Sequence, residues 1–514
     1  MALTVTPDVA ALRADLAPHT VESIAELIGP VAVAAMDREQ SVPALRATEA
    51  MVGPGVDTPG AAVLLRLFVL GTEVTRAQLD RALPRTGTAG SARLGLVEAA
   101  GGDADDVVRA LVDLQPYATQ DAAGTVQWWL ASDRGELATG RSLRPDHVLG
   151  VGGASLTLAR ATVRDPRRRV LDLGTGCGIQ ALHATRHSAA VVGTDVSARA
   201  LRFAAFNAAL AGVAIELRKG SMLEPVVGET FDLVVSNPPF VITPRAAGGV
   251  PRFEYRDGGL AGDDVVRDLV TGVGAVLEPG GVAQLLANWE HRRGQDWRDR
   301  VGEWLDAAGL DAWVVQREVL DPAEYAETWL RDGGTTSDRD PAAWESGYRA
   351  WLEDFEARDV EGVGFGLVVL RRPAQDGARP TLRRLEDVGS PVARPLGEHV
   401  ASVLRAHDWL TAHDDAALAD ARLVVSHDVV EDRHHTPGAA DPALVRLRQG
   451  DGFTRAVTVG TAVAAVVGAC DGDLPVGPII GAVAGLLGRP TADVSAEVLP
   501  VVRDLLLDGF LRVG

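Results

Sequence analysis

The spacing of apolar residues divides the chain into stretches of different periodicity. Up to about residue 124 most apolar positions recur at helical spacing. Thr75 can cap a helix that runs to about Leu83, and Val107–Tyr117 and Val126–Leu130 look like short strands. Helices followed by a small hairpin predict a winged-helix-like module, which binds nucleic acid in some proteins and is a scaffold in others. The other predicted helices are Val9–Leu16, Val21–Ile28, Pro30–Arg38, Pro43–Ala50 and Pro59–Val69.

From about residue 141 strands alternate with helices, a pattern typical of a parallel α/β sheet. The predicted strands are Val170–Leu173, Ala190–Thr194, Ile215–Arg218, Phe231–Val235, Val282–Ala287, Asp311–Val319 and Val363–Leu370. Residues 321–360 form an insertion with aromatic residues at near-helical spacing, which favours packing, with substrate recognition as the alternative.

The remaining chain begins with a segment rich in proline and arginine, 373–395, which reads as a linker. Helical patterns follow, and their series predicts a second winged-helix-like fold over residues 396–514. The expected domains are therefore 1–124, 125–372 and 396–514. A chain of 514 residues is long enough for about three domains.

Composition narrows the functional classes. The formal net charge of −20 disfavours non-specific binding to phosphate backbones, because cationic side chains drive that binding. Only Cys177 and Cys470 are present, which excludes a cysteine zinc site. No apolar run approaches the roughly 20 residues of a membrane span, and the N-terminus lacks an export pattern. The expected location is cytoplasmic.

Asn237-Pro238-Pro239-Phe240 follows the apolar strand Phe231–Val235 and carries the chemistry. The prolines leave the carbonyls of Asn237 and Pro238 facing a cleft, beside the Asn237 side-chain carbonyl. Two fixed acceptors can take both hydrogens of a planar NH2 group, and the Phe240 ring can stack on its π-system. The motif predicts a site for an amide or an exocyclic amine.

A glycine-rich turn and an acidic residue predict a nucleoside cofactor. The strand Val170–Leu173 ends in Asp172-Leu173-Gly174-Thr175-Gly176-Cys177-Gly178, where glycines allow a tight turn close to a ligand. Asp195 ends the next strand, where a carboxylate can accept from both ribose hydroxyls. A dinucleotide-dependent dehydrogenase is the alternative, but it would prefer a different glycine spacing.

The glycine turn and Asn-Pro-Pro-Phe together resemble the class I S-adenosylmethionine-dependent N-methyltransferases. The resemblance implies a seven-stranded Rossmann-like sheet, S-adenosyl-L-methionine as the cofactor, and catalysis by Asn237, Pro238 and Phe240. The cofactor contacts it implies are Asp172, Gly174, Thr175, Gly176, Gly178, Asp195, Ser221, Met222 and Asn237. Ser221 stands where family members commonly have an acidic residue.

The segment Glu254–Asp263 is similar to the one that follows the motif in HemK-type release factor glutamine methyltransferases. The leading substrate is therefore a protein glutamine, in a partner such as a translation release factor. Phe240 is more familiar in enzymes that methylate RNA or DNA bases, at adenine N6 or guanine N2, and these are the alternative. A small activator subunit is a further partner to test.

Two histidine clusters were weighed as metal sites. His183 and His187 lie at metal-ligand spacing, yet no third ligand follows. The group His427, Asp428, Asp432, His434 and His435 matches no derivable site. No metal is predicted.

Overall fold

The computed structural model describes residues 3–52, 58–121, 124–135, 139, 143–245, 252–375, 377–390, 392, 395–438 and 440–514. Its internal contacts separate two compact units. The first unit holds residues 1–158, 166–310 and 318–378, and the second holds residues 159–165, 311–317 and 379–514. Within the described residues, no helix has the length and apolarity to cross a membrane.

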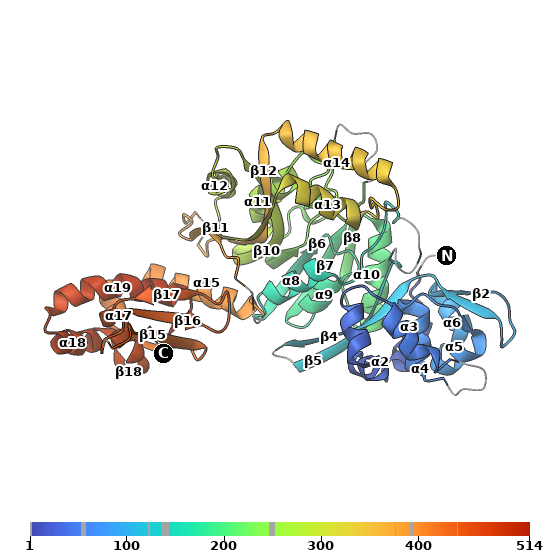
Figure 1. Ribbon diagram of the computed structural model, residues 1–514, viewed down its shortest axis with the longest axis horizontal. Coiled ribbons are helices and arrows are strands. Elements are labelled where there is room, and N and C mark those ends of the chain that lie inside the picture. Colours follow the sequence, from blue (N-terminus) through green and yellow to red (C-terminus); the bar gives the residue numbers. More distant parts are fainter. Residues whose placement is uncertain are drawn as a thin grey trace. The chain divides into compact units, whose positions relative to one another are not determined.

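The first unit is organised around a sheet that confirms the predicted α/β fold. Six of its strands lie in the order β12-β10-β9-β6-β7-β8. Neighbours from β10 to β8 are parallel, and β12 is antiparallel to β10 (Figure 1). The strands are β6 (Arg167–Leu173), β7 (Ser188–Asp195), β8 (Glu216–Lys219), β9 (Phe231–Ser236), β10 (Leu277–Arg292) and β12 (Val360–Arg371).

The strand order changes direction between β6 and β9, since β7 and β8 lie on one side and β10 on the other. In open parallel sheets, ligands bind at the carboxyl ends of the strands at such a switch point. Leu173 pairs with Ser236, so the glycine turn after β6 and Asn237 after β9 begin side by side. The connecting helices are α8 (Gly153–Ala161), α9 (Ile179–Ala184), α10 (Ala198–Ala211), α11 (Asp264–Gly272) and α12 (Trp297–Ala308).

The N-terminal region contains a short three-stranded antiparallel sheet in the order β1-β3-β2. Two helices and then the hairpin of β2 and β3 follow β1, whereas the winged-helix-like expectation placed the hairpin at Val107–Tyr117 and Val126–Leu130. Its elements are α1 (Asp8–Leu16), α2 (Val21–Met36), α3 (Val42–Glu49), α4 (Gly60–Leu64), a π-helical turn (Leu65–Val69), β1 (Val74–Thr75), α5 (Arg76–Ala82), α6 (Gly87–Leu94), β2 (Val97–Ala99) and β3 (Val107–Ala110).

The N-terminal region shares one hydrophobic core with the helices beside the glycine turn. Leu12 and Phe68 belong to the same buried cluster as Cys177 and Phe206. The boundary expected between residues 124 and 125 falls instead within the hairpin of β4 (Asp113–Asp121) and β5 (Gly124–Ser132). Sequence periodicity could not show this, because it reports which residues are apolar and not which elements they bury against.

The insertion forms two helices, α13 (Pro322–Asp332) and α14 (Pro341–Glu356), which pack against β12 (Figure 1). Its aromatic residues form a buried cluster with Val241 and Ile242, the two residues after Phe240. Tyr325 and Trp351 are fully buried there. The packing interpretation is confirmed, and the packing reaches the segment that follows Asn-Pro-Pro-Phe.

The second unit contains β11 (Asp311–Leu320) paired in parallel with β13 (Arg383–Asp387). The segment expected as a linker, 373–395, therefore includes a strand; its residues 376, 391, 393 and 394 lie outside the described part. Beyond it two small antiparallel sheets, β18-β14-β19 and β15-β16-β17, share a core with the last three helices. The elements are α15 (Gly397–Ala412), α16 (Asp415–Asp420), β14 (Arg422–Val425), β15 (Val429–His434), β16 (Leu444–Gln449), β17 (Ala456–Val459), α17 (Thr461–Gly468), β18 (Asp471–Pro475), α18 (Val476–Leu487), α19 (Thr491–Leu507) and β19 (Leu511–Val513).

Candidate active site

A cavity of about 520 Å³ opens at the carboxyl ends of β6, β7 and β9. Its volume lies within the range of pockets that bind cofactors and drug-sized molecules. The sequence-predicted residues that line it are Gly174, Thr175, Gly176, Asp195, Ser221, Met222, Asn237 and Pro238. Asp172, Gly178 and Phe240 are not on its wall, although all three were predicted to contact ligand.

The glycine turn is held by backbone hydrogen bonds to the neighbouring strand. The N–H groups of Gly174 and Thr175 both donate to the Thr194 carbonyl at 2.9 Å. Gly174 has φ of 75° and Gly176 has φ of 56°, a region that favours glycine. The turn therefore keeps its backbone open toward the cavity.

Asp172 supports the turn from behind. One carboxylate oxygen accepts from the Thr175 hydroxyl at 2.6 Å and from the Ala181 N–H at 2.9 Å. The side chain is 1% exposed, and its burial raises the pKa of Asp172 to about 7. Gly178 is a packing position, because a Cβ there would lie 3.2 Å from the Ala204 Cα of α10. These two residues support the turn and do not line the cavity.

Asp195 connects the turn to the end of β7. Its carboxylate accepts from the Gly176 N–H at 2.9 Å and from the Ser197 N–H at 2.8 Å. Burial raises the pKa of Asp195 above the usual value for aspartate. A carboxylate oxygen can accept more than one hydrogen bond, so lone pairs remain on the cavity side.

Ser221 and Met222 complete this wall after β8. The Gly220 N–H donates to the Asp195 carbonyl at 3.0 Å, which brings the β8 turn to the end of β7. Met222 has a positive φ of 46°, an uncommon conformation for a residue with a side chain. The strained turn places both residues on the cavity wall.

Asn237 lies at the opposite wall, directly after β9. Its side-chain oxygen is buried and has no hydrogen-bond partner among the described residues. Leaving a buried acceptor unpaired costs about 1–3 kcal/mol, so native proteins rarely keep one without a functional reason. The backbone carbonyl of Asn237 is 3.9 Å from the position that a Cβ on Gly174 would take. The unpaired acceptor therefore stands beside the glycine turn.

Pro238 and Phe240 differ from the expectation. The Phe240 N–H donates to the Pro238 carbonyl at 2.8 Å, so this acceptor is already used once within the chain. The Phe240 ring packs edge-on against Phe365, with the ring centroids 6.2 Å apart, and belongs to the aromatic cluster of the insertion. The structure therefore does not place this ring on the cavity wall, where stacking on a substrate was predicted.

The aromatic insertion forms hydrogen bonds with both backbone groups of Ile242, two residues after the motif. The Ile242 N–H donates to the Tyr325 hydroxyl at 2.8 Å, and the Trp351 indole N–H donates to the Ile242 carbonyl at 2.8 Å. Each bond connects a fully buried aromatic side chain to the chain just beyond Phe240. The insertion thus fixes the backbone directly after the motif.

The hairpin of the N-terminal region is tied to the glycine turn by Asn207 on α10. The Asn207 amide donates to the carbonyls of Ala131 and Cys177 and accepts from the Ala131 N–H, at 2.7 to 2.9 Å. Asn207 is fully buried. Burial also raises the pKa of the Cys177 thiol to about 11, so Cys177 is neutral and unsuited to act as a nucleophile.

The histidine clusters form no metal site in the part of the chain that is described. No group of three or more potential ligands is found within these residues. The His183 ring shares a hydrogen bond of 2.8 Å with the Tyr117 hydroxyl, which connects it to the hairpin. Asp432 and His434 of the second cluster lie on β15, and Asp432 pairs with Arg448 of the neighbouring strand.

Comparison with known proteins agrees with this geometry. Residues 150–250 match the family model described as Methyltransferase small domain. Residues 16–111 and 401–513 match two domains of unknown function, DUF7059 and DUF7782.

Curated relatives match over part of their length. A release factor glutamine methyltransferase of Xylella fastidiosa is 42% identical over 160 residues, which cover 30% of this chain and 56% of that protein. One from Deinococcus radiodurans is 42% identical over 130 residues, covering 24% and 46%. The chain spans about half the length of the curated relatives it matches.

Solved structures are similar at lower identity. The YcgJ protein from Bacillus subtilis is 17% identical with a TM-score of 0.28, over 43% of this chain and 97% of that one. The Thermus thermophilus 16S rRNA N2 G1207 methyltransferase is 19% identical with a TM-score of 0.26, over 48% and 62%. These scores are too low to bear on function.

Residues 150–250 belong to a class I methyltransferase domain. The resemblance stated from the sequence is confirmed, and the cofactor of such a domain is S-adenosyl-L-methionine. The sheet order and the two turns at the switch point are those that this domain requires.

The cavity of the methyltransferase domain suits that cofactor. Its described lining includes four acidic residues, Asp195, Glu254, Asp257 and Asp268, and neither lysine nor arginine. S-adenosyl-L-methionine carries a sulfonium and an ammonium charge, which an acidic wall attracts. Leu149, Ile179, Val196 and Met222 supply apolar surface for a nucleoside.

Two lining segments of the domain were not among the predicted site residues. His147–Gly150 precedes the first strand, and Gln180 donates to the Ser155 carbonyl at 2.7 Å to hold the start of α8 nearby. The Glu254 N–H donates to the Pro145 carbonyl at 2.8 Å, so the loop 254–260 meets this segment over the cavity. The sequence singles out Glu254–Asp263 only for its resemblance to other methyltransferases, and folding is what brings residues 254–260 to the cavity wall.

Proposed function

We propose that this protein is an S-adenosyl-L-methionine-dependent N-methyltransferase whose acceptor is the side-chain amide of a protein glutamine. The single observation that carries the proposal is the unpaired, buried side-chain oxygen of Asn237 on the wall of the cofactor cavity. Such an acceptor needs a donor from the substrate, and a primary amide offers two N–H groups. The similarity of 130 to 160 residues of this chain to release factor glutamine methyltransferases supports the same acceptor.

The residues that would hold the cofactor are the glycine turn, Asp195 and the β8 turn. When bound there, S-adenosyl-L-methionine supplies an electrophilic methyl group on a sulfonium sulfur. The carboxylate of Asp195 is positioned for the ribose hydroxyls, and Ser221 and Met222 for the base. The acidic lining stabilises the cationic part of the ligand.

The chain's own contribution to the reaction is to orient the acceptor nitrogen. Asn237 accepts one N–H through its side-chain oxygen, and the second lone pair of the Pro238 carbonyl accepts the other. Both bonds favour a nitrogen whose lone pair is out of conjugation and aimed at the cavity. As positive charge develops on nitrogen the two carbonyl dipoles bind it more strongly, which lowers the barrier. Stacking by Phe240 stays a prediction.

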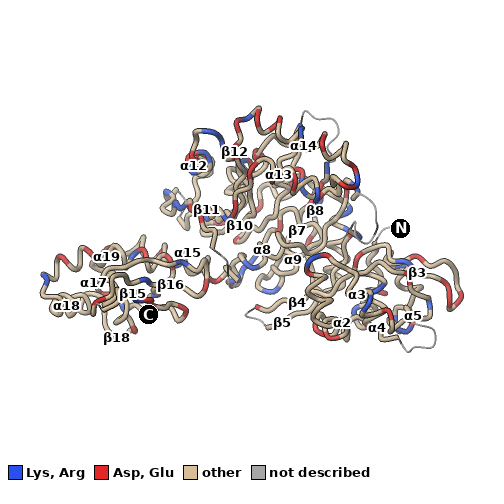
Figure 2. The backbone as a smooth tube through the Cα atoms, in the orientation of Figure 1, with Lys and Arg blue, Asp and Glu red and all other residues tan. Residues whose placement is uncertain are grey.

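An amine of an RNA or DNA base is the second candidate, and the arrangement β1-α5-α6-β2-β3 favours it. The charged residues of this module argue against it as a nucleic-acid-binding surface. Arg93, the basic residue of α6, is paired with Asp8 at 2.8 Å. The turn between β2 and β3 carries Asp103, Asp105 and Asp106, which would repel phosphate (Figure 2).

Transfer of tritiated methyl groups to an extract that lacks the native enzyme tests the proposal. Aliquots are treated afterwards with protease or with nuclease. Release of the label by protease alone, and recovery of N-methylglutamine after hydrolysis with peptidases, is the expected result. Release by nuclease would overturn the glutamine acceptor in favour of a base amine.

A further inference from the structure

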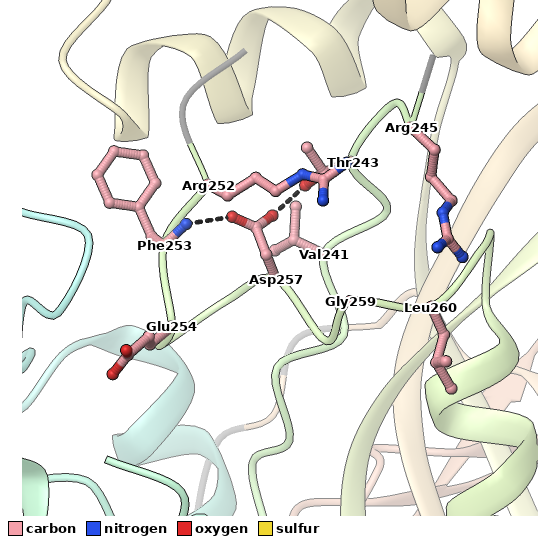
Figure 3. Close-up of a pocket in the computed structure, with 9 residues that line it drawn as sticks. All are labelled: Val241, Thr243, Arg245, Arg252, Phe253, Glu254, Asp257, Gly259 and Leu260. Carbon is pink, nitrogen blue, oxygen red and sulfur yellow. Dashed lines mark hydrogen bonds between the residues drawn. The ribbon is translucent and has the colours of Figure 1, made fainter. Parts of the chain in front are cut away.

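A second cavity lies beside the Asn-Pro-Pro-Phe motif. It has a volume of about 160 Å³ and is shown in Figure 3. Its lining residues are Val241, Thr243, Arg245, Arg252, Phe253, Glu254, Asp257, Gly259 and Leu260. Four of these, in the loop 254–260, also line the cofactor cavity. The two cavities are therefore separated only by that loop.

The wall between the cavities is firmly joined to the motif. Phe240 forms an isolated antiparallel bridge with Asp257, and the Val241 N–H donates to the Arg256 carbonyl at 2.8 Å. Gly258 packs so closely that a Cβ there would be 2.7 Å from the Pro239 carbonyl. A substrate chain that presents a nitrogen to Asn237 must pass over this wall. The small cavity is thus within reach of residues that flank the acceptor.

The carboxylates that line the small cavity belong to Asp257 and Glu254. Asp257 accepts hydrogen bonds from the Thr243 hydroxyl and the Phe253 N–H, drawn as dashed lines in Figure 3. The Glu254 side chain points away from the other lining side chains in the same view. Among the described residues, the ion pair that Asp257 forms is with Arg256, at 3.8 Å, and not with Arg245 or Arg252.

Two arginines line the small cavity together with these two acids. Arg245 and Arg252 are exposed, and neither forms an ion pair within the described residues. Arg252 reaches toward Thr243, and Arg245 toward Leu260 (Figure 3). Two unpaired guanidinium groups in one cavity are notable in a chain of net charge −20, in which most arginines near the sheet are paired with acids.

We propose that this cavity binds the carboxylate side chain of an aspartate or glutamate that lies near the methylated glutamine in the protein substrate. The inference rests on the proposed function and names a feature of its substrate. Guanidinium groups bind carboxylates through paired, charge-assisted hydrogen bonds. A volume of about 160 Å³ suits one side chain and is below the roughly 300 Å³ at which small-molecule pockets begin, which argues against a nucleotide.

Binding of labelled peptides in the presence of S-adenosylhomocysteine tests the subsite apart from turnover. Each peptide contains one glutamine and a single glutamate at one of the four positions before or after it; its partner has glutamine in place of that glutamate. Fluorescence polarisation gives the dissociation constants. We expect at least one acidic peptide to bind about five-fold more tightly than its neutral partner, as for a partly exposed ion pair. Non-specific attraction cannot produce this result, because the protein's net charge repels acidic peptides.

The double variant Arg245→Gln/Arg252→Gln should remove that preference, and Arg245→Lys/Arg252→Lys should keep part of it. Arg349→Gln is the matched control, because this exposed arginine of α14 lines neither cavity. Equal binding of all acidic and neutral peptides, or a preference that survives the double glutamine variant, overturns the subsite. Arginine-dependent binding of a single-stranded oligonucleotide in place of the peptides overturns it as well. Failure of the glutamine function is scored separately, by the protease and nuclease arms of the extract experiment.

Discussion

Replacement of Asn237 by alanine separates stability from turnover. In most proteins the loss of a buried polar side chain weakens the fold, because its partners are left unpaired. The side-chain oxygen of Asn237 has no hydrogen-bond partner among the described residues, so its removal leaves no donor among them unpaired. The same change removes the acceptor on which the proposed chemistry depends.

The expected magnitudes follow from that asymmetry. Loss of one preorganised hydrogen-bonding group that acts on the transition state lowers kcat by about 10²–10³-fold, or about 3–4 kcal/mol. An unpaired buried acceptor destabilises the fold by about 1–3 kcal/mol, so its removal should leave the melting temperature unchanged or raise it. The affinity for the cofactor should stay within a few-fold, because the glycine turn and Asp195 are intact.

Three measurements on purified protein check these expectations: tritiated methyl transfer, calorimetric titration with S-adenosylhomocysteine, and thermal unfolding. Asn207→Ala is the matched control, since Asn207 makes three hydrogen bonds to Ala131 and Cys177. That variant should lose about 2 kcal/mol or more of stability. An Asn237→Ala enzyme with undiminished turnover refutes the catalytic role. An Asn237→Ala variant as unstable as Asn207→Ala refutes the view that the Asn237 side-chain oxygen is unpaired.

Three further changes test the surroundings. Asp195→Ala should raise the dissociation constant for S-adenosylhomocysteine about ten-fold or more by calorimetry, with Asp195→Asn intermediate; an unchanged constant contradicts the ribose assignment. Tyr325→Phe leaves the buried Ile242 N–H without its acceptor and should lower thermal stability by about 1–3 kcal/mol. Tyr348→Phe loses only a partly buried hydrogen bond to Glu327 and should not lower it. Equal effects of the two changes argue against a stabilising role for the bond between Ile242 and Tyr325. Burial raises the pKa of Asp172 from 3.8 to about 7, so the folded state holds this proton more tightly and stability from this group is lost as pH rises through about 7. Asp172→Asn should therefore melt progressively higher, relative to the natural protein, between about pH 4 and 7, with the difference levelling off above about pH 7; a difference in melting temperature that stays constant from about pH 4 to 7 would show that the carboxyl is not protonated in the fold.

Much of the catalytic half was predictable because its signals are local. Asn237-Pro238-Pro239-Phe240 fixes backbone conformation through proline, and the alternate glycines after Asp172 permit positive φ whatever surrounds them. The strands of the sheet were found from short apolar runs for the same reason. The directions of the Phe240 and Asp172 side chains could not be predicted, because a motif names a residue without saying which way its side chain points. Phe240 faces the insertion and Asp172 faces the back of the turn.

The chain's sequence by itself determined the α/β class, the glycine turn, the acid at the end of β7 and the Asn-Pro-Pro-Phe turn after β9, since each depends on residues close together in the chain. Tertiary structure decided what lies around them. The carboxyl ends of β6 and β9 lie side by side because the two strands are neighbours at the point where the strand order reverses. The loop 254–260 divides two cavities because it bridges to Phe240. The N-terminal region shares the core of the methyltransferase domain through contacts such as Asn207 with Ala131. Hydrophobic burial is not directional, so it specifies which residues leave water but not which partners they meet; that choice is made by the packing of the whole unit.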